Sequence, residues 1–381
     1  MRRRDFLKLG MIGTASVLQG WEGLAGAAQK AAGPLPFPAP VYRTLGRTGL
    51  KITIVSFGAM LTPEPEVIRV AFEHGVNYVD TARRYMNGRN EEIVARALKG
   101  MHDKVYVATK IISSSRSKED VVRDVETSLK ALERDHIDVI QLHSVTGRER
   151  LFEPEMRKAL VKLKQQGKVR FFGVTTHTNE TEVVNALVDD KDRFFDTVLV
   201  KYNFRSGDDL KKAIARAAQA GIGVIAMKTQ AGGYTTDALG PISPHQAALK
   251  WALQDKNVTA AIPGMRDMGH LREDLAVMGM RLTLADSLIL RTYGAAVAPY
   301  YCHFCGKCEE TCPRGVAISV VNRSLMYAEA YRSPELARST YGEIPLSASA
   351  SSCLGCGRCT AHCVNGLDIA AKMARARELL A

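Results

Sequence analysis

Short apolar runs alternate with amphipathic stretches along most of the chain from Lys51 onward. Each apolar run has the length of a buried strand, and each stretch between them has the spacing of a helix with one apolar face. The predicted strands are Ile52–Gly58, Tyr78–Thr81, Val105–Lys110, Val139–His143, Phe171–Thr175, Thr197–Tyr202, Gly221–Met227 and Thr259–Pro263. The predicted helices lie near residues 64–74, 90–99, 118–133, 153–167, 179–188, 208–220, 244–254 and 268–278. Eight strand–helix repeats predict an α/β fold, a closed (β/α)8 TIM barrel.

Three successive predicted strands each end in an ionisable side chain. Asp80, Lys110 and His143 occupy these ends, and Tyr85 follows Asp80 by five residues. Side chains at the carboxyl ends of barrel strands converge on one mouth, where barrel active sites lie. We therefore predict an active site. The alternative is a barrel without activity, in which an Asp–Lys ion pair and a packed Tyr and His serve only the structure.

The residues around these positions resemble the aldo-keto reductase family. The matching runs are Asp80-Thr-Ala-x-x-Tyr85 with Asn87-Gly and Glu91, Ala-Thr-Lys110, Gln141-Leu-His143, Phe172-Gly-Val-Thr-Thr176, and Ala261-Ile-Pro-Gly264 followed by Leu271-Arg-Glu-Asp274. The resemblance covers about residues 42–280. It implies that Tyr85 is the general acid and that Lys110 lowers the pKa of Tyr85. It also implies that Asp80 is the partner of Lys110 and that His143 orients the substrate.

The chemistry of carbonyl reduction suits these residue types. Hydride transfer to a carbonyl leaves an alkoxide that needs a proton, and a tyrosine with a pKa near 10 is a weak acid unless a cation stabilises its phenolate. Lys110 would supply that cation and Asp80 would keep it charged. A neutral His143 would hydrogen-bond the carbonyl oxygen.

The resemblance also implies a nicotinamide cofactor, NADP or NAD. The corresponding cofactor-binding positions are Thr175, Thr176, Lys228, Gly264, Met265, Arg266, His270 and Asp274. Two other positions depart from the family pattern, because Leu199 replaces a glutamine and Met227 replaces an aromatic residue. The block after the eighth strand also lacks the family's usual grip on a 2′-phosphate, so the choice between NADH and NADPH stays open. No Gly-x-Gly-x-x-Gly turn opens a helix, which argues against a Rossmann domain.

All eight cysteines lie beyond residue 300, in two motifs with the same Cys-x2-Cys-x2-Cys-x3-Cys spacing. This is the spacing of a two-cluster bacterial-type ferredoxin, in which the fourth cysteine of each motif ligates the other cluster. We therefore predict two [4Fe–4S] clusters. Cys302, Cys305, Cys308 and Cys363 would hold one cluster, and Cys353, Cys356, Cys359 and Cys312 would hold the other.

Disulfides and zinc are the alternatives for these cysteines. A cysteine at every third residue makes a poor disulfide framework, and paired zinc sites leave the third cysteine of each triplet unexplained. The gap from Cys312 to Cys353 contains a predicted helix, Val320–Arg332, and a predicted loop, Ser347–Ser352. These elements favour a small, mainly helical ferredoxin-like domain. The resemblance therefore narrows to aldo-keto reductases with a C-terminal cluster module.

The first 27 residues predict an export signal. Arg3-Arg4-x-Phe6-Leu7-Lys8 resembles the bacterial twin-arginine motif, and it precedes an uncharged run and Ala25-Gly-Ala27. The expected organisation is a signal peptide (1–27), a linker (28–41), the barrel (42–298) and the cluster domain (299–381). The expected location is the periplasm or the cell envelope. A frayed basic terminus and a retained membrane tether are the alternatives.

The formal net charge of +12 changes this picture little. Four cations and two carboxylates in residues 1–27 account for +2 of it, and the remaining basic residues are spread along the predicted helices. A solvated basic surface is favoured over nucleic-acid binding, and an acidic redox partner protein is compatible with it. The other expected partner is a small carbonyl or alcohol substrate. After signal cleavage we expect no membrane-spanning segment.

Three functions are compatible with these features. The first is an exported oxidoreductase that interconverts a carbonyl and an alcohol and exchanges electrons through its clusters. The second is an electron-transfer or docking subunit with a non-catalytic barrel. The third is an NAD(P)H carbonyl reductase whose clusters only brace the C-terminal domain.

Overall fold

The computed structural model describes residues 37–235, 239 and 242–380. The predicted signal peptide and residues 28–36 of the predicted linker lie outside this range. Residues Pro38–Ala381 form one compact unit. Among the described residues, no helix combines the length and apolar character that a membrane crossing requires.

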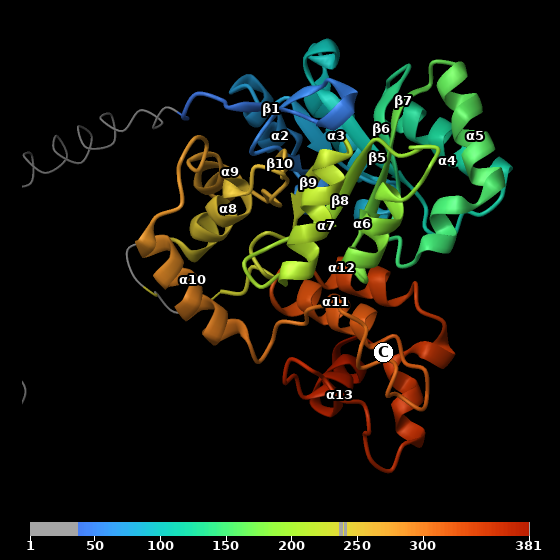
Figure 1. The fold of residues 1–381 in the computed structure, drawn as a ribbon, viewed down its shortest axis with the longest axis vertical. Helices are drawn as coiled ribbons and strands as arrows, with labels where there is room; N and C mark the ends of the chain where they lie inside the picture. The colour runs from blue at the N-terminus through green and yellow to red at the C-terminus, as the bar shows by residue number, and fades with distance from the viewer. Residues whose placement is uncertain (1–36, 236–238, 240–241, 381) are drawn as a thin grey trace, which may run out of the picture. The chain divides into compact units, whose positions relative to one another are not determined.

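Eight parallel strands form the barrel, as predicted (Figure 1). They are β3 (Phe57–Gly58), β4 (Tyr78–Asp80), β5 (Tyr106–Ile111), β6 (Ile137–Leu142), β7 (Val169–Thr176), β8 (Thr197–Lys201), β9 (Gly223–Met227) and β10 (Ala260–Ala261). Each strand pairs with the next strand along the chain. Parallel bridges from Val55 to Ala261 and from Gly58 to Gly264 join the last strand to the first, so the sheet closes on itself.

A helix follows each of the eight barrel strands, at the places that the apolar spacing predicts. These helices are α2 (Pro65–Glu73), α3 (Asn90–Leu98), α4 (Lys118–Ala131), α5 (Pro154–Gln165), α6 (Glu180–Val188), α7 (Asp208–Gln219), α8 (Pro244–Gln254) and α9 (Met268–Leu275). Helix α7 shows the physical reason, because its buried residues Leu210, Ala213, Ile214 and Ala217 recur at helical spacing on one face. Helix α4 begins at a capping box between Ser117 and Asp120.

The first predicted strand, Ile52–Gly58, is wrong in its amino-terminal part. Residues 51–53 belong instead to an antiparallel hairpin, β1 (Tyr42–Thr44) with β2 (Lys51–Thr53). The hairpin packs Leu45, Leu50 and Ile52 against side chains from the barrel strands. Gly46, at φ +47°, lies so close to the backbone of Gly221 and Gly223 that a Cβ would clash there. The hairpin therefore closes one end of the barrel, and the site must open at the other.

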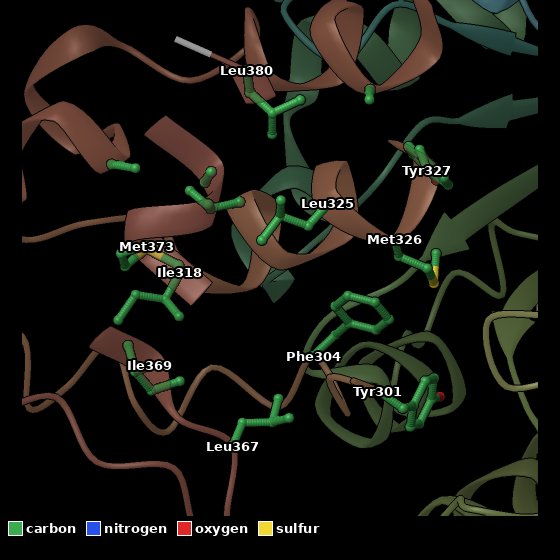
Figure 2. Packing of buried hydrophobic residues seen from close by; sticks show 14 of the residues in the cluster. Tyr301, Phe304, Ile318, Leu325, Met326, Tyr327, Leu367, Ile369, Met373 and Leu380 are labelled. Atoms are coloured by element: carbon green, nitrogen blue, oxygen red, sulfur yellow. The ribbon is translucent and has the colours of Figure 1, made fainter. Parts of the chain in front are cut away.

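The C-terminal region is mainly helical, as predicted. Residues 299–381 contain α11 (Ile318–Glu329), α12 (Pro334–Tyr341) and α13 (Ile369–Leu380), and α10 (Leu284–Val297) precedes them. The predicted loop Ser347–Ser352 instead forms parts of two short 3-10 turns, Leu346–Ala348 and Ala350–Gly355. Apolar residues from these helices and from the cysteine-containing loops share one core, which Figure 2 shows around Phe304, Leu325 and Met373.

This C-terminal core continues into the barrel. It includes Ala231, which lies just after β9, and Tyr293 and Val297 of α10. Two hydrogen bonds also join the loops after the barrel strands to the C-terminal region. The Asn203 amide donates to the Tyr301 hydroxyl at 2.9 Å, and the Arg266 guanidinium donates to the Tyr331 carbonyl at 2.6 Å. The C-terminal region thus covers the carboxyl ends of the barrel strands, where the predicted site residues lie.

Candidate active site and cluster-binding cysteines

A buried ion pair lies at the barrel mouth. The Lys110 amino group on β5 is 2.5 Å from Asp80 Oδ1 on β4, and it also donates to the Thr81 carbonyl at 2.7 Å. The Gln141 amide donates to the other Asp80 oxygen at 2.7 Å. Both charged side chains are at most 3% exposed. Burial lowers the pKa of Lys110, and Asp80 opposes that shift.

Tyr85 and His143 lie together beside this pair. Tyr85 opens a short turn, Tyr85–Gly88, in the loop that follows β4, and His143 comes directly after β6. Their rings meet edge to face with centroids 6.1 Å apart, and Lys110 Nζ is 4.8 Å from the centre of the Tyr85 ring. The structure therefore brings together all four residues that were predicted to be catalytic.

The pKa of Tyr85 differs in direction from the expectation. Burial raises the pKa of Tyr85 well above its ordinary value, and Asp80 acts in the same direction. The cation that acts against the shift is Arg323, and Lys110 is paired with Asp80. For His143, burial lowers the pKa well below its ordinary value, and Lys110 and Arg323 add to this effect. His143 is therefore neutral near pH 7, as its predicted role requires.

A cavity of about 310 Å³ opens over these residues. The barrel contributes Tyr85, His143, His177 and Lys228 to its wall, and the C-terminal region contributes Arg323, Tyr327 and Tyr331, among others. The Lys228 amino group donates to the Tyr327 hydroxyl at 2.9 Å, directly across the boundary between the two regions. The cavity is thus built by both regions together.

Tyr327 has an unusual electrostatic environment. Burial raises the pKa of Tyr327, but Lys228 and Arg323 oppose burial and outweigh it, so the pKa lies below its ordinary value. Tyr327 in turn acts on the pKa values of Tyr85 and Lys110. Sequence reasoning missed Arg323 and Tyr327, although their spacing of four within the predicted helix Val320–Arg332 places them on one face.

Sequence reasoning also missed His177. It follows β7 as His143 follows β6, so the pattern of ionisable groups at strand ends continues beyond the three that were used. Its side chain is 7% exposed, and Nδ1 has no hydrogen-bond partner among the described residues.

The eight cysteines lie in two segments of the C-terminal region, and none of them forms a disulfide. In the first segment, Phe304 at φ +56° and Gly306 at φ +74° allow the tight backbone, and the Phe304 amide donates to Cys302 Sγ at 3.3 Å. Among the described residues, no group of three or more His, Cys, Asp or Glu side chains is placed to hold a single metal ion. A [4Fe–4S] cluster makes a different demand, because each of its irons takes one thiolate.

The two motifs meet at their fourth cysteines. The Thr311 hydroxyl, beside Cys312, accepts from the His362 amide, beside Cys363, at 3.1 Å. Cys363 lies close enough to Cys308 for their thiolates to repel, and Cys312 is among the thiols that act on Cys353 in the same way. This arrangement fits the predicted exchange of the fourth ligand between the two clusters.

Comparison with known families decides what the two regions are. The aldo/keto reductase family matches residues 63–239, and the 4Fe–4S dicluster domain matches residues 301–368. The protein combines an aldo/keto reductase domain with a 4Fe–4S dicluster domain. It is therefore an oxidoreductase of the aldo/keto reductase type.

Relatives and solved structures agree with the barrel part of this assignment. The chain is 27% identical over 281 residues to L-galactose dehydrogenase from Arabidopsis thaliana, and the alignment covers 62% of this chain and 87% of the relative. It is 34% identical over 160 residues to the aldo-keto reductase YhdN from Bacillus subtilis, which covers 36% of this chain and 48% of the relative.

Among solved structures, an aldo-keto reductase from Klebsiella pneumoniae in complex with NADPH aligns with a TM-score of 0.57 at 24% identity. The alignment covers 66% of this chain and 95% of that chain. The holo form of an aldo-keto reductase from Bacillus halodurans aligns with a TM-score of 0.56 at 22% identity, over 66% of this chain and 96% of that chain. These likenesses concern the fold.

The predicted cofactor-binding residues of the reductase domain fall into two groups. Lys228, Gly264, Arg266 and His270 line the cavity. The other four are buried and do not line the cavity. Each has a hydrogen-bond partner: the Thr175 hydroxyl accepts from the Ser144 amide, the Thr176 hydroxyl donates to the Thr178 carbonyl, the Met265 carbonyl accepts from the Thr62 hydroxyl, and the Asp274 carboxylate accepts from the Gln230 amide. The cavity-lining group is the part of the prediction that can touch a cofactor in this arrangement.

The Asp80–Lys110 pair predicts a specific stability pattern. Lys110→Met leaves Asp80 as a buried carboxylate without its cation, so the free energy of unfolding should fall by about 3–5 kcal/mol. Adding Asp80→Asn should recover most of that loss, because the uncompensated charge is gone. Urea unfolding of the two variants and the wild type measures this. If the double variant is less stable than Lys110→Met alone, burial of the charge is not the cause.

The cysteine arrangement predicts the metal content and its loss. Anaerobically purified protein should carry about eight irons and eight acid-labile sulfides per chain. Cys312→Ser and Cys363→Ser should each damage the cluster that is built mainly by the other motif, which iron analysis and electron paramagnetic resonance can detect. Glu310→Gln is the matched control, because Glu310 lies between Cys308 and Cys312 of the first motif but is not a ligand. It should leave the iron content unchanged. Zinc in place of iron in the wild type would contradict the assignment.

Proposed function

We propose that this protein is an exported carbonyl reductase that uses a nicotinamide cofactor and exchanges electrons with a partner protein through two [4Fe–4S] clusters. The observation that carries the proposal is the meeting of Tyr85, His143 and the Asp80–Lys110 pair at one cavity. Their residue types and spacing match those that the aldo/keto reductase family uses. The reverse reaction, oxidation of an alcohol, uses the same groups.

The side chains account for substrate orientation and proton transfer. Neutral His143 donates a hydrogen bond to the carbonyl oxygen and holds it next to Tyr85. The Tyr85 phenol is protonated at neutral pH, and its raised pKa makes it a weaker acid than an ordinary tyrosine. An alkoxide is a much stronger base than a phenolate, so it takes this proton as it forms. Lys110, held by Asp80 and Thr81, then lies 4.8 Å from the ring that carries the phenolate.

The cavity residues fit a nicotinamide cofactor, which supplies or accepts the hydride when bound. Lys228 and Arg266 are cations that line the cavity, and Gly264 leaves room for close approach beside them. The positions of Lys228 and Arg266 do not distinguish NADH from NADPH. The block Gly264–His270 differs from the residues with which the family usually binds the 2′-phosphate of NADPH.

The dicluster domain supports the electron-transfer part of the proposal. When bound, [4Fe–4S] clusters supply one-electron transfer, and two of them would together carry the two electrons needed to return an oxidised nicotinamide to its reduced form after one carbonyl is reduced. Cys302, Cys305, Cys308 and Cys363 would hold one cluster, and Cys353, Cys356, Cys359 and Cys312 the other. The shared cavity wall places the domain that would hold them directly against the reductase site.

A second candidate is a carbonyl reductase whose clusters only brace the C-terminal domain. The continuous core between α11, α10 and the barrel favours it, because such a brace would hold the cavity wall in place. Reduction of the clusters during turnover separates the two candidates. The third candidate function is a docking subunit without catalysis. It predicts clusters that exchange electrons in a protein that reduces no carbonyl.

The role of Tyr85 predicts the effect of removing one oxygen. Tyr85→Phe should lower the rate of carbonyl reduction about 10²- to 10⁴-fold, because a positioned general acid contributes that much. The assay screens small aldehydes, diketones and quinones with NADH and NADPH. Tyr106→Phe, at the opposite end of β5 from Lys110, is the matched control and should keep the wild-type rate. A Tyr85→Phe enzyme as fast as the wild type would exclude the tyrosine acid.

The export part of the proposal rests on the sequence Arg3-Arg4-x-Phe6-Leu7-Lys8. Replacing Arg3 and Arg4 by lysine should retain a folded, cluster-bearing protein in the cytoplasm, because the twin-arginine route reads the arginine pair itself. Cell fractionation with iron analysis measures this, and Arg2→Lys serves as the control that keeps export. Export of the double variant with its clusters intact would contradict the proposed route.

A further inference from the structure

One buried arginine in the cavity wall has no counter-charge among the described residues. The Arg323 side chain on α11 lines the cavity, is 8% exposed, and forms no ion pair with any described residue. Its Nε is buried and has no hydrogen-bond partner within the described part of the chain. A buried cation without a partner costs stability, so such a group is expected to serve a ligand.

The other cations in the cavity wall are paired, hydrogen-bonded or, like Arg332, exposed to solvent. Lys110 pairs with Asp80, Arg84 lies 3.3 Å from the Glu343 carboxylate, and Arg266 donates to the Tyr331 carbonyl. Lys228 is an intermediate case, because its hydrogen-bond partner is the phenol of Tyr327 rather than a carboxylate. The unmatched positive charge is thus concentrated where Arg323 and Lys228 face the cavity.

Arg323 is close to the reacting groups. Its charge acts on the pKa values of Tyr85 and His143, and on that of His177 farther along the strand ends. An anion bound at Arg323 would therefore share the cavity with a carbonyl held by Tyr85 and His143. A guanidinium is suited to a carboxylate, because its planar fork can donate two parallel hydrogen bonds.

We propose that Arg323, with Lys228 and Tyr327 beside it, binds a carboxylate of the substrate, so that the protein acts on oxo acids and the corresponding hydroxy acids. This inference rests on the proposed carbonyl reductase function. It assigns substrate recognition to a residue of the dicluster domain, so the domain would take part in substrate choice as well as in electron transfer.

The test compares an acid with its neutral ester. The substrates are 4-oxobutanoate and methyl 4-oxobutanoate, which share the aldehyde and the chain and differ in charge. In the holoprotein, Arg323→Met should raise KM for the acid about 10- to 100-fold, as expected for a lost hydrogen bond to a charged group. KM for the ester should change less than about threefold. Arg323→Lys should recover part of the affinity for the acid.

A matched control and the overturning results complete the test. Arg338→Gln changes an exposed arginine on α12 outside the cavity wall and should leave both KM values unchanged. If Arg323→Met affects acid and ester equally, the residue is only structural. If it instead weakens binding of NADH or NADPH and keeps the preference for the acid, the cation serves the cofactor phosphates. Either result overturns the proposal.

A binding measurement keeps the inference separate from the reaction. If no carbonyl is reduced with either nucleotide, the proposed function fails, and calorimetry with succinate as the probe still tests the carboxylate site. Succinate binding by the wild type that is lost in Arg323→Met and kept in Arg338→Gln would support the site. Absence of succinate binding by the wild type would overturn it.

Discussion

The packing of α11 across the carboxyl ends of the barrel strands is the constraint on which the rest of the structure depends. The hairpin β1–β2 closes the opposite end, so the barrel has one mouth, and α11 supplies part of its wall. The hydrogen bond from Lys228 to Tyr327 joins the two regions at the cavity itself. The reductase site is therefore not complete in the barrel alone, and the dicluster domain is part of it.

This arrangement gives the cavity two kinds of cation. Lys110 is paired with Asp80, and burial leaves the pKa of Tyr85 raised. Arg323 is uncompensated, and its charge acts on Tyr85, His143 and Tyr327 alike. Burial and the barrel charges Asp80 and Lys110 act most strongly on the pKa values of Tyr85 and His143, and Arg323 of the dicluster domain acts on both as well.

The parts that sequence could predict are those that depend on local periodicity. Apolar spacing located the strands and helices of the barrel, and strand order alone placed Asp80 and Lys110 on neighbouring parallel strands. The split between the hairpin and β3 was missed, because a continuous apolar run does not show where the chain changes sheet. Arg323 was missed as a site residue, because its role depends on how a distant helix packs. The direction of the Tyr85 pKa shift depends on burial, which no local pattern reports.

A double-mutant cycle across the boundary between the barrel and the dicluster domain tests the central claim most directly. Lys228→Met and Tyr327→Phe are made singly and together, and kcat/KM for carbonyl reduction is measured for each form. If the two regions build one site, the effects should be non-additive, with a coupling free energy of about 1 kcal/mol or more. Effects that add to within about 0.3 kcal/mol would show that the barrel works independently of α11, and would contradict the account.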